Sequence, residues 1–207
     1  MSDDCGAELF EASLMLLAGT SVLYRASTGR TVDPWAVVDA HAVTQLRVEF
    51  EAESSATWFA DVMQAMPDAR CSIRRRVAGI RRQYETFVVH VDGAEPSTVV
   101  GRLHSAWIQN LELLLGNGAS DERALRARAA AVWRVAMLTA APRVSSTGLQ
   151  LRARDRSSAR LLLRAAQLLG VTGQARTSRG FQVVRVEGRG VITLLSTVRS
   201  VPGPFRV

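Results

Sequence analysis

The sequence predicts an α+β protein in which one structural unit occurs twice. The segment Leu46 to Ala56, LRVEFEAESSA, returns 103 residues later as LQLRARDRSSA, from Leu149 to Ala159. Both copies alternate apolar and polar residues, as a strand with one buried face does, and both lead into an amphipathic helical pattern. A second pair, Val88 to Gly93 and Val183 to Gly188, repeats as VVHVDG and VVRVEG. Two repeats in the same order predict a duplicated fold.

The first half predicts the order helix, one or two strands, helix, hairpin, helix. Apolar residues at helical spacing mark its first helix, and a serine hydroxyl, Ser54 or Ser55, is expected to cap the second. The hairpin turns around Ala78-Gly79. The expected elements are a helix over 9–19, a strand with an irregular insertion over 20–42, a strand over 46–52, a helix to Met66, hairpin strands over 72–77 and 84–91, and short helices over 95–103 and 104–115.

The second half predicts the same order. Pro142 stops its first helix, Ser157 or Ser158 is expected to cap its second, and Gly170 ends that one. The expected elements are a helix over 121–141, a strand over 149–153, a helix to Leu169, hairpin strands over 172–177 and 181–186, and a helix over 190–198. We therefore predict a first repeat over 1–103, a linker over 104–121, a second repeat over 122–200 and a tail over 201–207.

Composition excludes several classes of protein. With 47% hydrophobic and 22% charged residues, the chain has the balance of a soluble globular protein. No apolar run approaches the roughly 18 to 20 residues that span a bilayer, and residues 1–20 lack the features of a signal peptide. The two cysteines, Cys5 and Cys71, lack the CxxC or Cys/His spacing of a metal site. We expect a cytoplasmic, nucleoid-associated protein without a metal or cofactor.

Charge divides the chain unevenly. All 26 basic residues are arginine, which a GC-rich coding bias or a preference for guanidinium explains equally well. Residues 1–68 carry a net charge of −8, whereas residues 69–207 carry +15. Such an asymmetry predicts a polyanionic or acidic partner for the second part.

The charged residues of the repeated segments and hairpins are the candidate site. Strand alternation predicts that the first segment presents acids where the second presents arginines. The arginines predicted to bind DNA are Arg74, Arg75, Arg76, Arg81, Arg82, Arg152, Arg154, Arg156, Arg176, Arg179 and Arg185, and the acids predicted to bind a partner are Glu49, Glu51 and Glu53.

Other chemistry is not favoured. The three histidines are isolated in the sequence, with no HExxH motif and no carboxylate at the spacing of a metal ligand. We therefore interpret His41, His90 and His104 as structural. The four tryptophans include Trp58 and Trp133 on apolar helix faces, which favours a place in the core over base stacking.

Specific segments resemble a known family. RR followed by YETFVVHVDG at Arg81 to Gly93, and AVWRVAML, LQLRARDRSSARLLLRAAQLLGV and FQVVRVEG within residues 131–188, resemble the WhiA family of sporulation and cell-division regulators of Gram-positive bacteria. The N-terminal region of that family is similar to the LAGLIDADG homing-endonuclease fold. The resemblance implies two pseudo-symmetric αββαββα repeats, with head helices (here about Leu9 to Gly19 and Arg123 to Ala140) packed at a pseudo-twofold axis and two sheets forming a saddle.

The resemblance also bears on catalysis. Homing endonucleases place an acidic residue from the end of each head helix on catalytic metal ions, because phosphodiester cleavage with Mg²⁺ needs carboxylate ligands. Residues 13–26 and 124–151 contain no Asp or Glu. We therefore expect no nuclease activity. The resemblance covers the saddle domain of the family and not its C-terminal helix-turn-helix domain, and the saddle domain's role could be contact with protein as well as with DNA.

Two functions remain open. The first is a WhiA-like, DNA-associated regulator of transcription or cell division whose basic second half and first hairpin contact phosphates. The second is a protein-interaction module that binds a partner protein or a second copy of itself through a groove with one acidic and one basic wall.

Overall fold

The computed structural model describes residues 9–15, 20–25, 43–64, 66, 68–78, 83–116, 121–139, 142–153, 155–178 and 181–200. These residues fall into two compact units, Met1–Ile108 and Gln109–Val207. Each unit is described by itself. The predicted packing of the two head helices, and a groove shared by the two repeats, concern the relation between the units and stay predictions.

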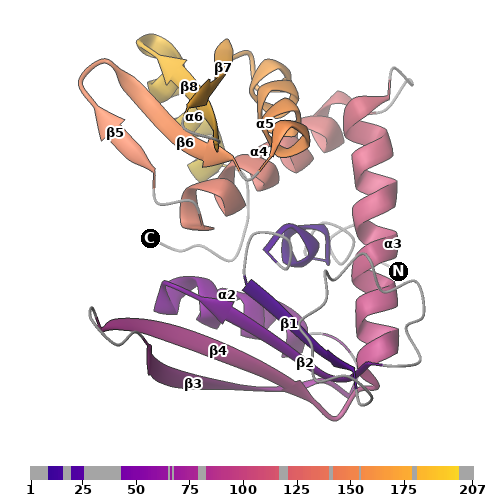
Figure 1. Ribbon diagram of the computed structural model, residues 1–207. Coiled ribbons are helices and arrows are strands. Elements are labelled where there is room, and N and C mark those ends of the chain that lie inside the picture. The colour runs from indigo at the N-terminus through magenta and orange to yellow at the C-terminus, as the bar shows by residue number, and fades with distance from the viewer. Residues whose placement is uncertain are drawn as a thin grey trace. The chain divides into compact units, whose positions relative to one another are not determined.

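The first unit is a four-stranded antiparallel sheet with helices on one of its faces (Figure 1). Its strands lie in the order β1-β2-β4-β3, and we call it sheet 1. The elements are a helical segment over 9–15, β1 (Thr20–Arg25), β2 (Val43–Phe50), α2 (Glu53–Gln64), β3 (Arg70–Ala78), β4 (Tyr84–Asp92) and α3 (Pro96–Leu115), which continues into the second unit.

The second unit repeats this arrangement. Its sheet, called sheet 2, has the strand order β5-β6-β8-β7, which is the order of sheet 1 with each strand replaced by its counterpart. The elements are α4 (Glu122–Thr139), β5 (Arg143–Ser145), β6 (Gly148–Ala153), α5 (Arg156–Leu168), β7 (Gly173–Ser178), β8 (Phe181–Glu187) and α6 (Arg189–Ser200). The predicted pair of αββαββα repeats is confirmed.

The register of the strands confirms the duplication residue by residue. Glu49 of β2 pairs with Val88 of β4, and Arg152 of β6 pairs with Val183 of β8. The turn after each hairpin is also conserved in conformation, because Gly93 and Gly188 both have positive φ values, 86° and 56°. Glycine adopts this conformation without the steric penalty that a Cβ atom brings.

The core of each unit lies between its sheet and its helices. In the first unit, Leu46, Val48 and Phe50 are buried, and the Phe50 and Phe59 rings pack with their centroids 5.5 Å apart. In the second unit, Trp133 of α4 is fully buried, and its Nε1 donates a hydrogen bond 3.1 Å long to the Leu162 carbonyl. The expectation that Trp58 and Trp133 belong to the core is confirmed.

Several predicted boundaries differ from the structure. α3 is one helix of 20 residues where two short ones were expected, and the division between the units falls inside it. Gly101 lies within it, and a single exposed glycine costs a helix only about 1 kcal/mol. The serine caps are wrong as well: the Asp155 side chain caps α5 by accepting from the Ser158 N–H at 2.7 Å, and α2 begins at Glu53.

Candidate nucleic-acid interface

Within the described residues, each sheet has one face without a covering helix, which we call its open face. Successive side chains of a strand point to opposite faces, so the residues that alternate with the buried ones belong to the open face. On sheet 1 these include Arg47, Glu49, Arg70, Arg74, Arg76, Val88, His90 and Asp92; on sheet 2 they include Arg143, Gln150, Arg152, Gln174, Arg176, Phe181, Val183, Arg185 and Glu187.

The open face of sheet 2 is predominantly basic. Among the described residues it carries four arginines, on β5, β6, β7 and β8, against a single acid, Glu187. That acid pairs with Arg185 at 2.9 Å. The guanidinium of Arg152 lies 5.6 Å from the centre of the Phe181 ring, at a distance suited to a cation–π contact. Because Phe181 is about half exposed, this face offers both positive charge and an aromatic surface to a partner.

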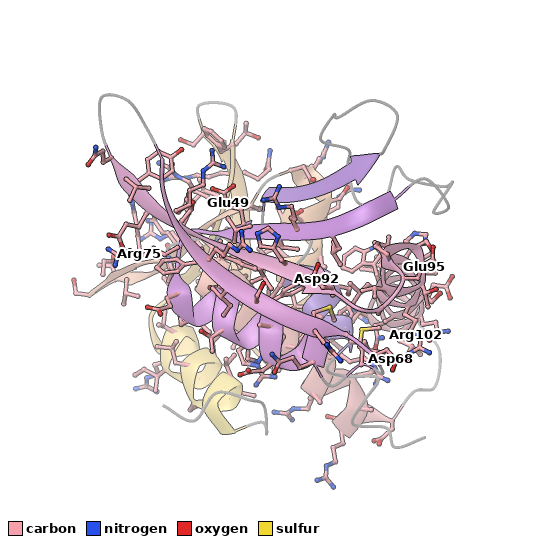
Figure 2. All side chains as sticks on the ribbon, turned by 90° about the horizontal axis from the view of Figure 1, so that it is seen from below. Glu49, Asp68, Arg75, Asp92, Glu95 and Arg102 are labelled. Atoms are coloured by element: carbon pink, nitrogen blue, oxygen red, sulfur yellow. The ribbon has the colours of Figure 1, made fainter. Side chains whose placement is uncertain are left out.

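The open face of sheet 1 has mixed charge. Figure 2 shows this face in front of α2, with Glu49 and Asp92 on its strands. Glu49 lies two strands from Arg74, with Val88 between them, and Asp92 lies opposite Arg70. Acids and arginines therefore alternate across this surface.

His90 is the buried centre of the mixed face. Its side chain is only 7% exposed. Burial lowers the pKa of the imidazole below its ordinary value, and the nearby cations Arg47 and Arg74 lower it further, while Asp92 opposes them. The imidazole is therefore neutral at pH 7, able to accept a hydrogen bond through one ring nitrogen and donate through the other.

The structure brings together five of the predicted DNA-binding arginines on open faces, Arg74 and Arg76 in the first unit and Arg152, Arg176 and Arg185 in the second. Arg75 points to the opposite face of β3, as the alternation requires, and its guanidinium pairs with Glu85. Arg156 is the first residue of α5. The remaining four, Arg81, Arg82, Arg154 and Arg179, lie outside the described residues.

The predicted row of three acids on one strand is wrong. β2 ends at Phe50, so only Glu49 projects from a strand. Glu51 is exposed in the bend that follows, and Glu53 is the first residue of α2. The same holds for the expected row of arginines: β6 ends at Ala153, so only Arg152 projects from the strand. On the strands, the reversal of sign between the two repeats remains at one pair of positions, Glu49 and Arg152, while Glu53 and Arg156 are the first residues of α2 and α5.

The sequence does not single out three residues of these faces: Arg47, Arg143 and Phe181. Each is a single side chain outside a charged run. The signal that could have found them is the strand alternation itself, extended from Glu49 back to Arg47 and from Val183 back to Phe181.

No alternative chemistry appears in the described part of the chain. Within it, no group of three His, Cys, Asp or Glu residues could hold a metal ion, and no helix is long and apolar enough to cross a membrane. Burial raises the pKa of the Cys71 thiol to about 11, so this thiol is protonated at neutral pH and weakly nucleophilic.

Proteins of known structure share this architecture. Neither a family model nor a curated protein matches the sequence. Among solved structures, I-DmoI in complex with DNA and Mn matches with a TM-score of 0.62 at 12% identity, over 96% of this chain and 99% of that one. The N-terminal LAGLIDADG domain of DUF199/WhiA matches with a TM-score of 0.51 at 10% identity, over 99% and 92%.

Full-length DUF199/WhiA from Thermatoga maritima also matches, with a TM-score of 0.52 at 11% identity, over 98% of this chain and 62% of that one. Identities this low establish the fold alone. The chain therefore has the LAGLIDADG homing-endonuclease-like fold.

Proposed function

We propose that this chain is a non-catalytic, DNA-associated regulatory protein of the WhiA type, which contacts DNA through the open face of sheet 2. The observation that carries the proposal is the set of four arginines on that face, one on each strand and opposed by one acid. A flat array of guanidinium groups suits phosphates of a nucleic-acid backbone, since each group can donate two parallel hydrogen bonds. I-DmoI, which shares the fold, is a protein solved in complex with DNA.

Arg152 and Arg176 are the arginines best placed for phosphate contact. Both lie opposite Val183, one on each side of it, so their side chains flank the middle strand of the face. Both are exposed, and neither makes an ion pair with a described residue. A phosphate that binds between them therefore need not displace an internal carboxylate.

The non-catalytic part of the proposal rests on the chemistry of the head helices. Cleavage by this fold needs carboxylates there to hold Mg²⁺, and residues 13–26 and 124–151 contain none. Supercoiled plasmid incubated with the protein and Mg²⁺ should stay intact. Nicking that follows the protein through purification would contradict the proposal.

The mixed face of sheet 1 favours a second candidate, a protein-interaction module. Glu49 and Asp92 lie among arginines there, and carboxylates repel a phosphate backbone. A partner protein, or a second copy of the chain, with complementary alternation of charge would be matched to such a surface.

Fluorescence titration of duplex DNA at several salt concentrations separates the two candidates. We expect the logarithm of the binding constant to fall with the logarithm of salt, by about 0.9 for each phosphate neutralised. The Arg152→Glu and Arg176→Glu substitutions should each weaken binding and flatten this slope. Arg160→Glu is the matched control, because Arg160 is exposed on α5, which packs on the covered face of the same sheet.

Absence of binding at low salt would remove the DNA proposal and leave the interaction module. Equal loss in the Arg160 control would show that net charge matters and that the open face is not the site. Circular dichroism of each variant checks that the fold is intact.

A further inference from the structure

The open face of sheet 1 contains a hollow of about 240 Å³. Its walls come from β2, β3 and β4, and all of its lining residues belong to the first unit. The lining residues are Arg47, Glu49, Arg74, Arg75, Arg76, Val88 and His90. Since Arg75 projects to the other face and pairs with Glu85, the remaining side chains define the chemistry of the hollow.

The floor of the hollow consists of two largely buried side chains. Val88 and His90 form it as alternate residues of β4, and their side chains are only 9% and 7% exposed. The neutral imidazole carries no charge that would demand water. An aromatic or heterocyclic ring could lie on this floor and exclude the remaining solvent.

One wall of the hollow is suited to an anion. Arg74 and Arg76 project from the same face of β3, with their Cα atoms about 7 Å apart at the usual strand rise. Both are exposed, and within the described residues neither belongs to an ion pair. Two guanidinium groups at this spacing can bind one phosphate group from two sides.

The opposite wall carries a carboxylate. Glu49 is two strands from Arg74, so their Cα atoms are about 10 Å apart at the usual strand spacing. A carboxylate accepts two parallel hydrogen bonds and repels a second phosphate. The hollow therefore suits a ligand with an anion at one end and adjacent N–H donors at the other.

We infer that this hollow is a binding site for a nucleoside monophosphate, with the phosphate between Arg74 and Arg76, the base on Val88 and His90, and the donor edge of the base toward Glu49. Guanine fits best, because its N1–H and N2–H₂ groups lie side by side, whereas adenine and cytosine each present one donor group beside an acceptor. The site is separate from the arginines proposed to contact DNA and does not depend on that proposal.

Isothermal titration calorimetry of the full chain with GMP, AMP and inorganic phosphate tests the inference. We expect GMP to bind more tightly than AMP, and both more tightly than phosphate. Arg74→Gln should weaken GMP binding tenfold or more, because a charged hydrogen-bond partner is lost. Glu49→Gln should remove the preference for GMP over AMP and should not weaken the binding of inorganic phosphate.

Arg102→Gln is the matched control, because Arg102 is an exposed arginine of the same unit that lies on α3, apart from Glu49 in Figure 2. Its affinity for GMP should equal that of the unmodified chain. No heat from GMP at about 1 mM, the weak limit for a specific small ligand, would overturn the inference. An equal loss of GMP affinity in Arg102→Gln would also overturn it. So would a result in which single-stranded DNA binds at this site and free GMP does not. None of these results bears on Arg152 and Arg176.

Discussion

The open faces of sheet 1 and sheet 2 have the same arrangement of strand positions, occupied by different side chains. In sheet 1, Glu49, Val88 and Arg74 lie side by side across three strands. In sheet 2, the residues in the same places are Arg152, Val183 and Arg176. The valine and one arginine are retained, and only the third position changes sign. Two copies of one backbone therefore differ in the sign of the charge at one position of this row.

The neighbouring row shows a subtler exchange. Arg47 and His90 of sheet 1 correspond to Gln150 and Arg185 of sheet 2. Each row keeps one arginine, but the arginine moves to the adjacent strand, and a titratable imidazole takes its former place. Sheet 2 is a surface of fixed positive charge, while sheet 1 combines both signs around a neutral ring. The first pattern suits a polyanion, and the second suits a smaller ligand that has both an anion and donors.

The cores differ in the same manner. The Phe50 and Phe59 rings pack in a tilted arrangement in the first unit, and the residues 103 positions later are the smaller Ala153 and Leu162. Trp133 donates its indole hydrogen bond to the Leu162 carbonyl and is fully buried beside it. The second unit therefore has its buried aromatic side chain on α4, whereas the first has this pair on β2 and α2.

Removal of Trp133 should have the largest effect. Trp133→Ala deletes a fully buried aromatic side chain and leaves the Leu162 carbonyl without this donor. We expect a loss of about 3–5 kcal/mol in the free energy of unfolding, as for other buried aromatics. Hydrogen exchange should show the loss in α4 and α5. Ile192→Ala, which truncates a side chain that is 72% exposed on α6, is the control and should cost less than about 0.5 kcal/mol.

A charge reversal at Glu49 sharpens the comparison of the open faces. Glu49→Arg gives sheet 1 the row of sheet 2, so DNA affinity at low salt should rise about tenfold, with a salt slope steeper by about 0.9. Glu51→Arg makes the same change in net charge at an exposed residue off the strand, and it should have the smaller effect. Equal gains in affinity in the two variants would mean that the position of Glu49 on the open face has no special role in DNA binding.

Capping provides a smaller difference between the units. The Asp155 carboxylate accepts from the Ser158 N–H at the start of α5, whereas the equivalent residue before α2 is Ala52. Asp155→Ala should lower the free energy of unfolding by about 1 kcal/mol, and Ala52→Asp should raise it by a comparable or smaller amount. Chemical denaturation measures both. A gain from Asp155→Ala would show that the cap does not stabilise the helix.

Much of the fold could be predicted from the sequence because the pattern of one unit occurs there twice. The repeats ending in SSA, and those ending in Gly93 and Gly188, fix strands, turns and their order. β5 could not be predicted from the residues, since three exposed residues carry no alternation. The continuity of α3 was also hard to predict, because Gly101 lies inside it and glycine is an unfavourable residue in a helix.

The site could be predicted only in part. Arginines at 74, 76, 152, 176 and 185 were found because charge runs and alternation coincide there. Arg75 was assigned to the same surface, although its alternation points it the other way. Arg47 and Phe181 were missed because the face of an isolated residue depends on where its strand begins and ends. The hollow depends on the pairing of β2, β3 and β4, which no single segment specifies.

The smallest effect concerns His90, whose place in sheet 2 is taken by Arg185. Burial, with Arg47 and Arg74, lowers the pKa of His90 in the folded protein below the value near 6.5 of an unfolded chain. The unfolded state therefore binds more protons in the window below pH 6.5, and stability falls as the pH drops through it. His90→Gln should make the free energy of unfolding less dependent on pH in that window and leave the dependence above it unchanged. Denaturation of both proteins across this range measures the difference, which cancels the contributions of His41 and His104; parallel curves would show that His90 is not the group that titrates.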